Sequence, residues 1–191
     1  MKLVLGSSSK FRKAQLSQLQ IDFDSFSPDI DEDSIKTSGL TPYEISRELS
    51  LKKAYAVLEN FQDSVVIGAD QVLNFEGRIF SKPGTEEKAI EQLMELSGKT
   101  HELITSYALV SKNKVIVESV ISKMTLRNLT KEQIEKYVSI DQPLYSCGSY
   151  KLETLGISLF ETIECPDHSA IIGLPLISLT TNLLQFGINI L

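Results

Sequence analysis

The sequence predicts an α/β protein, in which buried strands alternate with helices. Val65–Ile67 is a β-branched run that ends in a glycine, Gly68, and such a short run is typical of a buried strand. Lys2–Gly6 also reads as a buried strand, and a serine-rich turn leads from it into a helical pattern. Ligand sites of open α/β sheets lie where the strands end. We therefore expect Asp70 to lie where a buried sheet opens to solvent, unless it only begins a turn.

The composition is that of an ordinary soluble globular protein, with 191 residues, 42% hydrophobic and 23% charged. This length suits one domain over residues 1–191. A net charge of −6 argues against a nucleic-acid polymer as partner, because such a partner calls for a basic surface. No apolar run approaches the roughly 20 residues of a membrane-spanning helix. The apolar run near the N-terminus is also too short for the apolar core of a signal peptide. Because Cys147 and Cys165 also lack CxxC spacing and any zinc pattern, we expect a reduced, cytoplasmic protein with no membrane association.

The sequence predicts an anion-binding cradle at Ser7–Ser9 and the start of the helix that follows. A strand, a glycine–serine turn and a helix start together offer free N–H groups, hydroxyl donors and the positive end of the helix dipole. Lys10, Arg12 and Lys13 place three cations in the first helical turn, which opposes the dipole. A residue choice that opposes local stability indicates a ligand. The alternative is a solvated basic face.

Pro28–Asp33 is predicted to be an acidic loop that contains Glu32. Its four carboxylates repel one another, so their proximity needs a reason. Either the loop is a solvated surface segment, which is the common outcome for charge runs, or it contributes to a magnesium site. Mg²⁺ favours one or two carboxylates together with substrate phosphates.

Capping signals and apolar periodicity predict the remaining elements. Lys52 and Lys53 lie mid-helix, and either could simply be a surface residue. Lys82 is better placed, because it is held between a strand and Pro83, which restricts its backbone. The expected elements are a strand at 23–27, a helix from 41 to about 60, a hairpin of 71–75 with 78–80, a helix at 85–97, strands at 101–110 and 114–126, a helix at 130–138, an irregular stretch at 145–160 that ends in a strand at 157–160, and a final helix from about 175.

These polar features together suit the hydrolysis of a phosphoanhydride. In that chemistry a divalent metal binds phosphate oxygens, a carboxylate orients or deprotonates water, and cations stabilise charge on the leaving group. No Walker motif and no serine nucleophile elbow are present in the sequence. The residues concerned are Glu32 and Asp70 as carboxylates, Lys53 and Lys82 as cations, and Ser7–Arg12 as the cradle.

The chain resembles the Maf-type nucleotide pyrophosphatases. Its opening, LGSSSKFRKAQL, is similar to the family pattern of roughly L-A-S-x-S-P-R-R-x-x-L-L, with Lys10 in place of the proline. Further blocks follow in order over nearly the whole chain: the Asp31-Glu32 pair, the Lys53-Ala54 pair, IGADQV, SKPGTEEKA, LSGKTHELIT, CGSYKLE and IIGLPL. Each block alone is weak, but the ordered series is specific.

The resemblance implies a fold like that of inosine triphosphate pyrophosphatases, with an elongated, twisted, mixed sheet flanked by helices and a cleft between two lobes. It also implies cleavage of a nucleoside triphosphate to the monophosphate and pyrophosphate, with Mg²⁺ or another divalent cation such as Mn²⁺, by a homodimer. By position, Asp70 is the expected catalytic carboxylate acting on water, and Glu32 is expected to hold the metal with it. Lys82 is expected to take part in catalysis as well. The residues expected to hold the phosphates are Ser7, Arg12, Lys53 and Lys82.

Three positions indicate which base the substrate carries. The branch of the family that acts on dTTP and UTP has Arg, Thr and Gln there, and the branch that acts on 7-methyl-GTP has Trp, Gln and Glu. This chain has Phe11, Gln71 and Glu153, which resemble the second branch. An aromatic face suits the positive charge of N7-methylguanine, and a carboxylate can accept hydrogen bonds from the guanine N1–H and amine.

Three other interpretations stay open from the sequence. The same chemistry could act on dTTP, UTP or other modified nucleotides, although Gln71 and Glu153 count against a pyrimidine. The chain could instead be a nucleotide-binding regulator of cell division. In the plainest interpretation it is an α/β domain whose charges are only surface.

Overall fold

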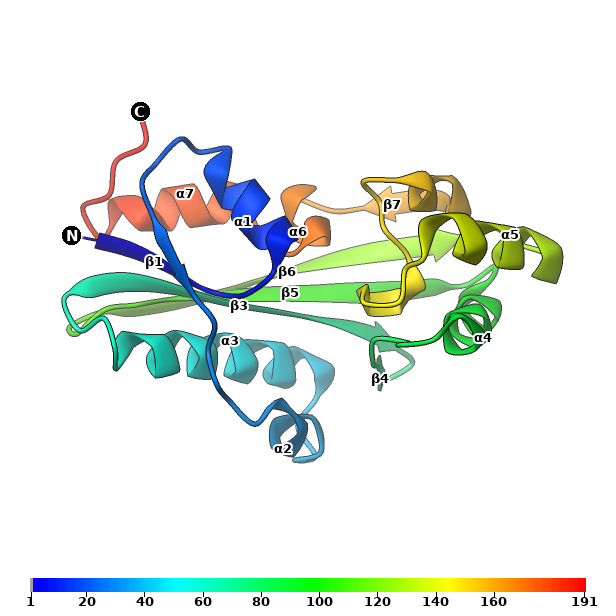
Figure 1. Ribbon diagram of the computed structural model, residues 1–191, viewed down its shortest axis with the longest axis horizontal. Coiled ribbons are helices and arrows are strands. Elements are labelled where there is room, and N and C mark those ends of the chain that lie inside the picture. The colour runs from blue at the N-terminus through cyan, green and yellow to red at the C-terminus, as the bar shows by residue number, and fades with distance from the viewer. Residues whose placement is uncertain (1) are drawn as a thin grey trace. The chain divides into compact units, whose positions relative to one another are not determined.

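The computed structural model describes residues 2–191, in which helices flank a twisted β-sheet (Figure 1). The helices are α1 (Lys10–Ser17), α2 (Glu32–Lys36), α3 (Pro42–Leu58), α4 (Glu86–Leu96), α5 (Lys131–Asp141), α6 (Ser169–Ile172) and α7 (Leu176–Leu184), with the 3-10 helices η1 (Cys147–Ser149) and η2 (Leu155–Leu159). The strands are β1 (Lys2–Gly6), β2 (Asp24–Phe26), β3 (Ser64–Phe75), β4 (Arg78–Phe80), β5 (Thr100–Val110), β6 (Val115–Leu126) and β7 (Phe160–Glu164).

The strands of residues 2–191 form one seven-stranded sheet in the order β2-β1-β3-β5-β6-β7, with β4 paired to β3. β1 runs parallel to both β2 and β3, whereas the β3–β4 and β6–β7 pairs are antiparallel. The predicted mixed sheet flanked by helices is therefore confirmed. Within the same residues, the helices are too short or too polar to cross a membrane.

The chain forms two compact units. The first contains the residues up to Gln71 together with Thr105–Val120 and Asp167–Leu191, and the second contains Val72–Ile104 and Ile121–Pro166. β3, β5 and β6 each contribute residues to both units. The single domain and the cleft between lobes stay predictions.

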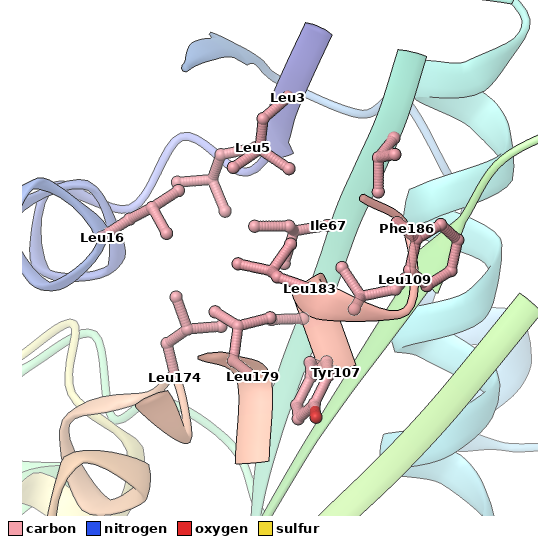
Figure 2. Packing of buried hydrophobic residues seen from close by; sticks show 12 residues of the cluster. Leu3, Leu5, Leu16, Ile67, Tyr107, Leu109, Leu174, Leu179, Leu183 and Phe186 are labelled. Carbon is pink, nitrogen blue, oxygen red and sulfur yellow. The ribbon is translucent and has the colours of Figure 1, made fainter. Parts of the chain in front are cut away.

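In the first unit the sheet carries a buried apolar layer on each face, because successive residues of a strand point to opposite sides. One layer contains α1 and α7, and its buried residues are Leu3, Leu5, Leu16, Val65, Ile67, Ala69, Tyr107, Leu109, Leu174, Leu179, Leu183 and Phe186 (Figure 2). The other layer contains α3, and its buried residues are Val4, Ala54, Val57, Val66, Ala108 and Val110. Figure 1 shows α3 on one side of β1 and β3, and α1 and α7 on the other. These two layers hold β3, the strand that carries Asp70.

β3 is longer than the sequence predicts, so the expectation that the strand ends at Gly68 was wrong. The strand continues to Phe75, and Gly68 pairs in register with Gly6 of β1. Asp70 therefore lies within the strand and is 6% exposed. Gly68 serves the packing of α3 instead, since a Cβ there would lie 2.1 Å from the carbonyl oxygen of Ser50.

Two other segments differ from expectation. The acidic run is not a loop throughout, because α2 begins at Glu32 and the side chain of Asp31 accepts a hydrogen bond from its first turn. Carboxylates at a helix N-terminus interact favourably with the helix dipole, which explains part of this acidic cluster. The strand expected at 157–160 is largely η2, with β7 beginning at Phe160, and Gly156 lets this turn pack against the backbone of Lys151.

A buried histidine–tyrosine pair lies in the second unit. His101 is 2% exposed, and its Nε2 lies 2.7 Å from the hydroxyl oxygen of Tyr150. The ring of Phe160 packs edge-on against Tyr150. Burial lowers the pKa of His101 to about 4, so its ring is neutral in the folded protein at neutral pH.

Acid is expected to destabilise the protein through His101. Its ordinary pKa of 6.5 lies above the folded value, so below that pH the unfolded chain binds the proton first. The free energy of unfolding should fall as the pH drops from 6.5 towards 4, by about 3 kcal/mol at most. Urea unfolding across this pH range measures the effect. The double variant His101→Phe, Tyr150→Phe is the control, and an equal pH dependence in both proteins would contradict the account.

Candidate active site

The contact between α3 and β3 brings a lysine to the side of Asp70. At Gly68 the backbone of α3 lies against the strand, because a Cβ there would be 2.1 Å from Ser50 O and 2.5 Å from Ala54 N. Lys53 precedes Ala54 on α3, and its ammonium reaches the carboxylate two residues beyond Gly68. The glycine is thus the local reason that helix and strand meet at this point.

Lys53 joins two carboxylates from different elements. Its Nζ lies 2.7 Å from Asp70 Oδ1 and 2.7 Å from Glu32 Oε1. The side chains of Lys53 and Asp70 are each 9% exposed, while that of Glu32 is 38% exposed. The structure therefore brings together three of the residues that the sequence singled out, with one side of the cluster open to solvent.

Glu32 is held as an anion at this site. Its Oε2 accepts a hydrogen bond of 2.9 Å from Lys36 Nζ on the next turn of α2. Burial raises the pKa of Glu32, but the hydrogen bonds and charges of Lys53 and Lys36 outweigh burial and lower the pKa to about 2. Burial lowers the pKa of Lys36, but the hydrogen bond to Glu32 and the charge of Glu32 outweigh burial and raise it. At neutral pH, Glu32 is therefore ionised.

A chain of three serines, two of them buried, supports the backbone of Asp70. The hydroxyl of Ser46, on α3, lies 3.3 Å from the carbonyl oxygen of Asp70 and 2.8 Å from the hydroxyl of Ser106, on β5. Ser106 in turn lies 2.8 Å from Ser119 on β6. These three residues were not predicted from the sequence, because a serine at a helix or strand position carries no signal of its partners.

The predicted anion cradle begins α1. The side chain of Ser9 caps the helix and accepts from Arg12 N at 3.4 Å, and Ser9 N donates to the hydroxyl of buried Ser7 at 3.2 Å. Arg12 Nε donates to the carbonyl oxygen of Gly173 at 2.9 Å. Phe11 is 46% exposed, so its ring is accessible from solvent. The cradle residues thus lie at the helix N-terminus, as the sequence predicts.

The side chain of Gln71, next to Asp70, donates hydrogen bonds to two other segments of the chain through its amide nitrogen. Its Nε2 donates to Thr105 Oγ1 at 2.9 Å and to the carbonyl oxygens of Ala170 and Ile171 at 3.0 Å each. These acceptors were not predicted from the sequence. Two of the three acceptors lie in blocks of the family resemblance, Thr105 in LSGKTHELIT and Ile171 in IIGLPL.

Comparison with known proteins settles the family. A family model described as "Maf-like protein" matches residues 2–186. The chain belongs to this family. The 7-methyl-GTP pyrophosphatase of Bdellovibrio bacteriovorus is 44% identical to this Maf-like protein over 93% of each chain. The 7-methyl-GTP pyrophosphatase of Pseudomonas aeruginosa is 40% identical over 98% of each chain. Among solved structures, the Ham1 protein of Staphylococcus aureus is similar with a TM-score of 0.49 and 16% identity, over 66% of this chain and 72% of that one.

The donor set of this Maf-like protein fits a divalent metal bound together with a substrate. Glu32 and Asp70 direct carboxylate oxygens at one cation, the ammonium of Lys53. Among residues 2–191 no three His, Cys, Asp or Glu side chains cluster as a complete metal cage. Mg²⁺ needs no such cage, because it keeps waters and binds substrate phosphates beside one or two carboxylates. These two side chains are therefore the ones that could hold it.

The last two predicted site residues of this Maf-like protein lie in the second unit. Lys82 follows β4 and is exposed, and Glu153 lies in an exposed turn before η2. Their roles toward the phosphates and the base stay predictions.

Proposed function

We propose that this protein hydrolyses a nucleoside triphosphate, with 7-methyl-GTP as its preferred substrate, to the nucleoside monophosphate and pyrophosphate. The observation that carries the proposal is the cluster of Lys53, Glu32 and Asp70, in which a buried carboxylate and an ionised partner converge on one cation. Such a cluster suits the binding of metal and the activation of water. The family, and relatives named for 7-methyl-GTP hydrolysis, support the same reaction.

Asp70 is the residue that acts on water in this proposal. Lys53 binds Oδ1 at 2.7 Å and so fixes the orientation of the carboxylate. The other oxygen, Oδ2, can accept a hydrogen bond from a water molecule and then its proton. A divalent ion such as Mg²⁺ or Mn²⁺, held by Glu32 and Asp70, would supply charge stabilisation for the phosphates.

The remaining predicted residues bind the substrate. Ser7 and Arg12 at the start of α1 hold phosphate oxygens, as a helix N-terminus with a guanidinium can. Lys53 and Lys82 add positive charge near the leaving group. Phe11 offers its half-exposed ring to the cationic base, and Glu153 accepts from the guanine edge. In this proposal the enzyme works in the cytoplasm, as its composition and cysteines predict, and it forms a homodimer, as the family resemblance implies.

A panel of nucleotides tests the substrate. We expect pyrophosphate release with Mg²⁺ to show the highest kcat/KM for 7-methyl-GTP when 7-methyl-GTP, GTP, dTTP, UTP and ITP are compared. A cation–π contact predicts that the methylated base exceeds GTP by about fivefold or more. Preference for dTTP or UTP would keep the reaction and contradict the base assignment. Release from none of them would favour a nucleotide-binding regulator.

A further inference from the structure

Ser169–Leu174, called here the carbonyl segment, receives side-chain donors from three other elements of the first unit. Arg12 Nε, on α1, donates to Gly173 O at 2.9 Å. Gln71 on β3 donates to Ala170 O and Ile171 O. The other donors to its carbonyls are Gln15 of α1, to Ser169 and Leu174, and Thr105 of β5, to Ala170. The segment therefore connects the cradle helix to the residue after Asp70.

The carbonyl segment is itself held in place by Asp167. This carboxylate is 4% exposed, and it accepts from Ser169 N at 3.0 Å through Oδ1 and from Ile177 N at 2.9 Å through Oδ2. The hydroxyl of Ser169 accepts from Leu176 N at 2.7 Å. Asp167 thus binds backbone N–H groups at the first residue of the segment and beyond its last residue, which supports the conformation of the segment.

Gly173 is the point where the segment meets Arg12. Its φ of +127° lies in the region that disfavours any residue with a Cβ. A Cβ there would also lie 3.3 Å from Arg12 Nε and 3.6 Å from its Cγ. The backbone conformation therefore favours glycine at this position, and a Cβ would push the Arg12 side chain aside by a few tenths of an ångström.

We propose that the carbonyl segment positions Arg12 for the phosphates of the substrate, and that Gly173 and Asp167 are positioning residues for it. The guanidinium is planar, so a hydrogen bond at Nε sets the plane in which its other nitrogens donate. This inference rests on the proposed function, in which Arg12 binds phosphate. It assigns a role to residues that touch neither the phosphates nor the water.

Two glycine variants separate positioning from general backbone strain. Gly173→Ala is expected to weaken the binding of inorganic pyrophosphate with Mg²⁺ on the order of tenfold. This is the effect of losing one charge-assisted hydrogen bond between Arg12 and the phosphate. Calorimetry measures the affinity. Gly187→Ala is the matched control, because Gly187 has a φ of +75° in the same unit but open space around its Cβ. It should lower the melting temperature and leave pyrophosphate affinity unchanged.

A double-mutant cycle shows whether the effect passes through Arg12. In an Arg12→Lys background, which lacks the Nε donor, Gly173→Ala should change pyrophosphate affinity less than about twofold. A full effect of Gly173→Ala in that background would overturn the proposal. So would equal effects of the two glycine variants, or an absence of pyrophosphate binding in the wild type.

Asp167→Asn provides a second variant in case Gly173→Ala fails to fold. Removing a negative charge should by itself strengthen anion binding. If Asp167 positions Arg12 through the carbonyl segment, the variant should instead weaken pyrophosphate binding by a few-fold, and stronger binding would overturn the proposal. Pyrophosphate binding needs no turnover, so the two proposals can fail separately. If the wild type binds pyrophosphate and the variants weaken that binding as expected, the positioning of Arg12 stands. If the same wild-type protein hydrolyses no nucleotide, only the proposed function fails.

Discussion

Asp70→Asn is expected to lower kcat for pyrophosphate release about a thousandfold, within the range typical for the loss of a general base. An amide cannot take a proton from water. The substitution also removes one of the two carboxylates that converge on Lys53. Steady-state kinetics with 7-methyl-GTP and Mg²⁺ measures the loss. A variant that kept more than about a tenth of the wild-type rate would contradict the role of Asp70.

The chain offers a matched control for this substitution. Asp63 is exposed and lies just before β3, so Asp63→Asn makes the same chemical change on the same stretch of chain, away from the Lys53 cluster. We expect the control to keep the wild-type rate. Circular dichroism and the melting temperature of both variants show whether each is folded.

Gly68→Ala is expected to destabilise the protein by about 3 kcal/mol or more, at the upper end for an overpacked core. The added Cβ would lie 2.1 Å from Ser50 O and 2.5 Å from Ala54 N. These are backbone atoms, so the clash is relieved only if α3 moves away from β3, and this movement would also separate Lys53 from Asp70. Urea unfolding measures the loss of stability.

Gly6→Ala calibrates that result within the same pair of strands. Gly6 is paired with Gly68 in the sheet, and a Cβ there would meet its nearest neighbours at 3.2 Å rather than 2.1 Å. The free energy of unfolding should fall clearly less than for Gly68→Ala. Equal losses, or a loss below about 1 kcal/mol for Gly68→Ala, would mean that close α3–β3 packing is not what requires the glycine.

Local signals in the sequence predicted most of the elements. Thr41 and Glu44 form the capping box expected at the start of α3. The apolar runs at Lys2–Gly6 and Val65–Ile67 are adjacent parallel strands of the sheet. These predictions succeeded because capping and strand burial depend on residues that are close in the sequence.

The role of Gly68 was predicted only in part, because the close approach of another backbone was expected but the continuation of the strand was not. A glycine after a β-branched run fits both the end of a strand and a close approach by another backbone. Only the position of α3, which is set by packing between distant residues, distinguishes the two. The start of α2 was missed, because the acidic run was predicted to be a loop, although Asp31 followed by Glu32 and Asp33 is a pattern typical of a helix N-terminus.

The candidate site was predicted in part. The sequence indicated Glu32, Lys53 and Asp70 as charged residues of one site, and the structure adds that a single ammonium joins the two carboxylates. The carbonyl segment could not be found, because Gln71 meets Ala170 about a hundred residues further along the chain. A backbone carbonyl acceptor leaves no trace in residue identity.

The products formed from 7-methyl-GTP test the central claim most directly. The wild-type protein with Mg²⁺ and the Asp70→Asn variant are incubated with the nucleotide, and the products are separated by anion-exchange chromatography. The account predicts equal amounts of 7-methyl-GMP and pyrophosphate from the wild type and almost none from the variant. Orthophosphate with a nucleoside diphosphate, or the same products at the same rate from the variant, would contradict it.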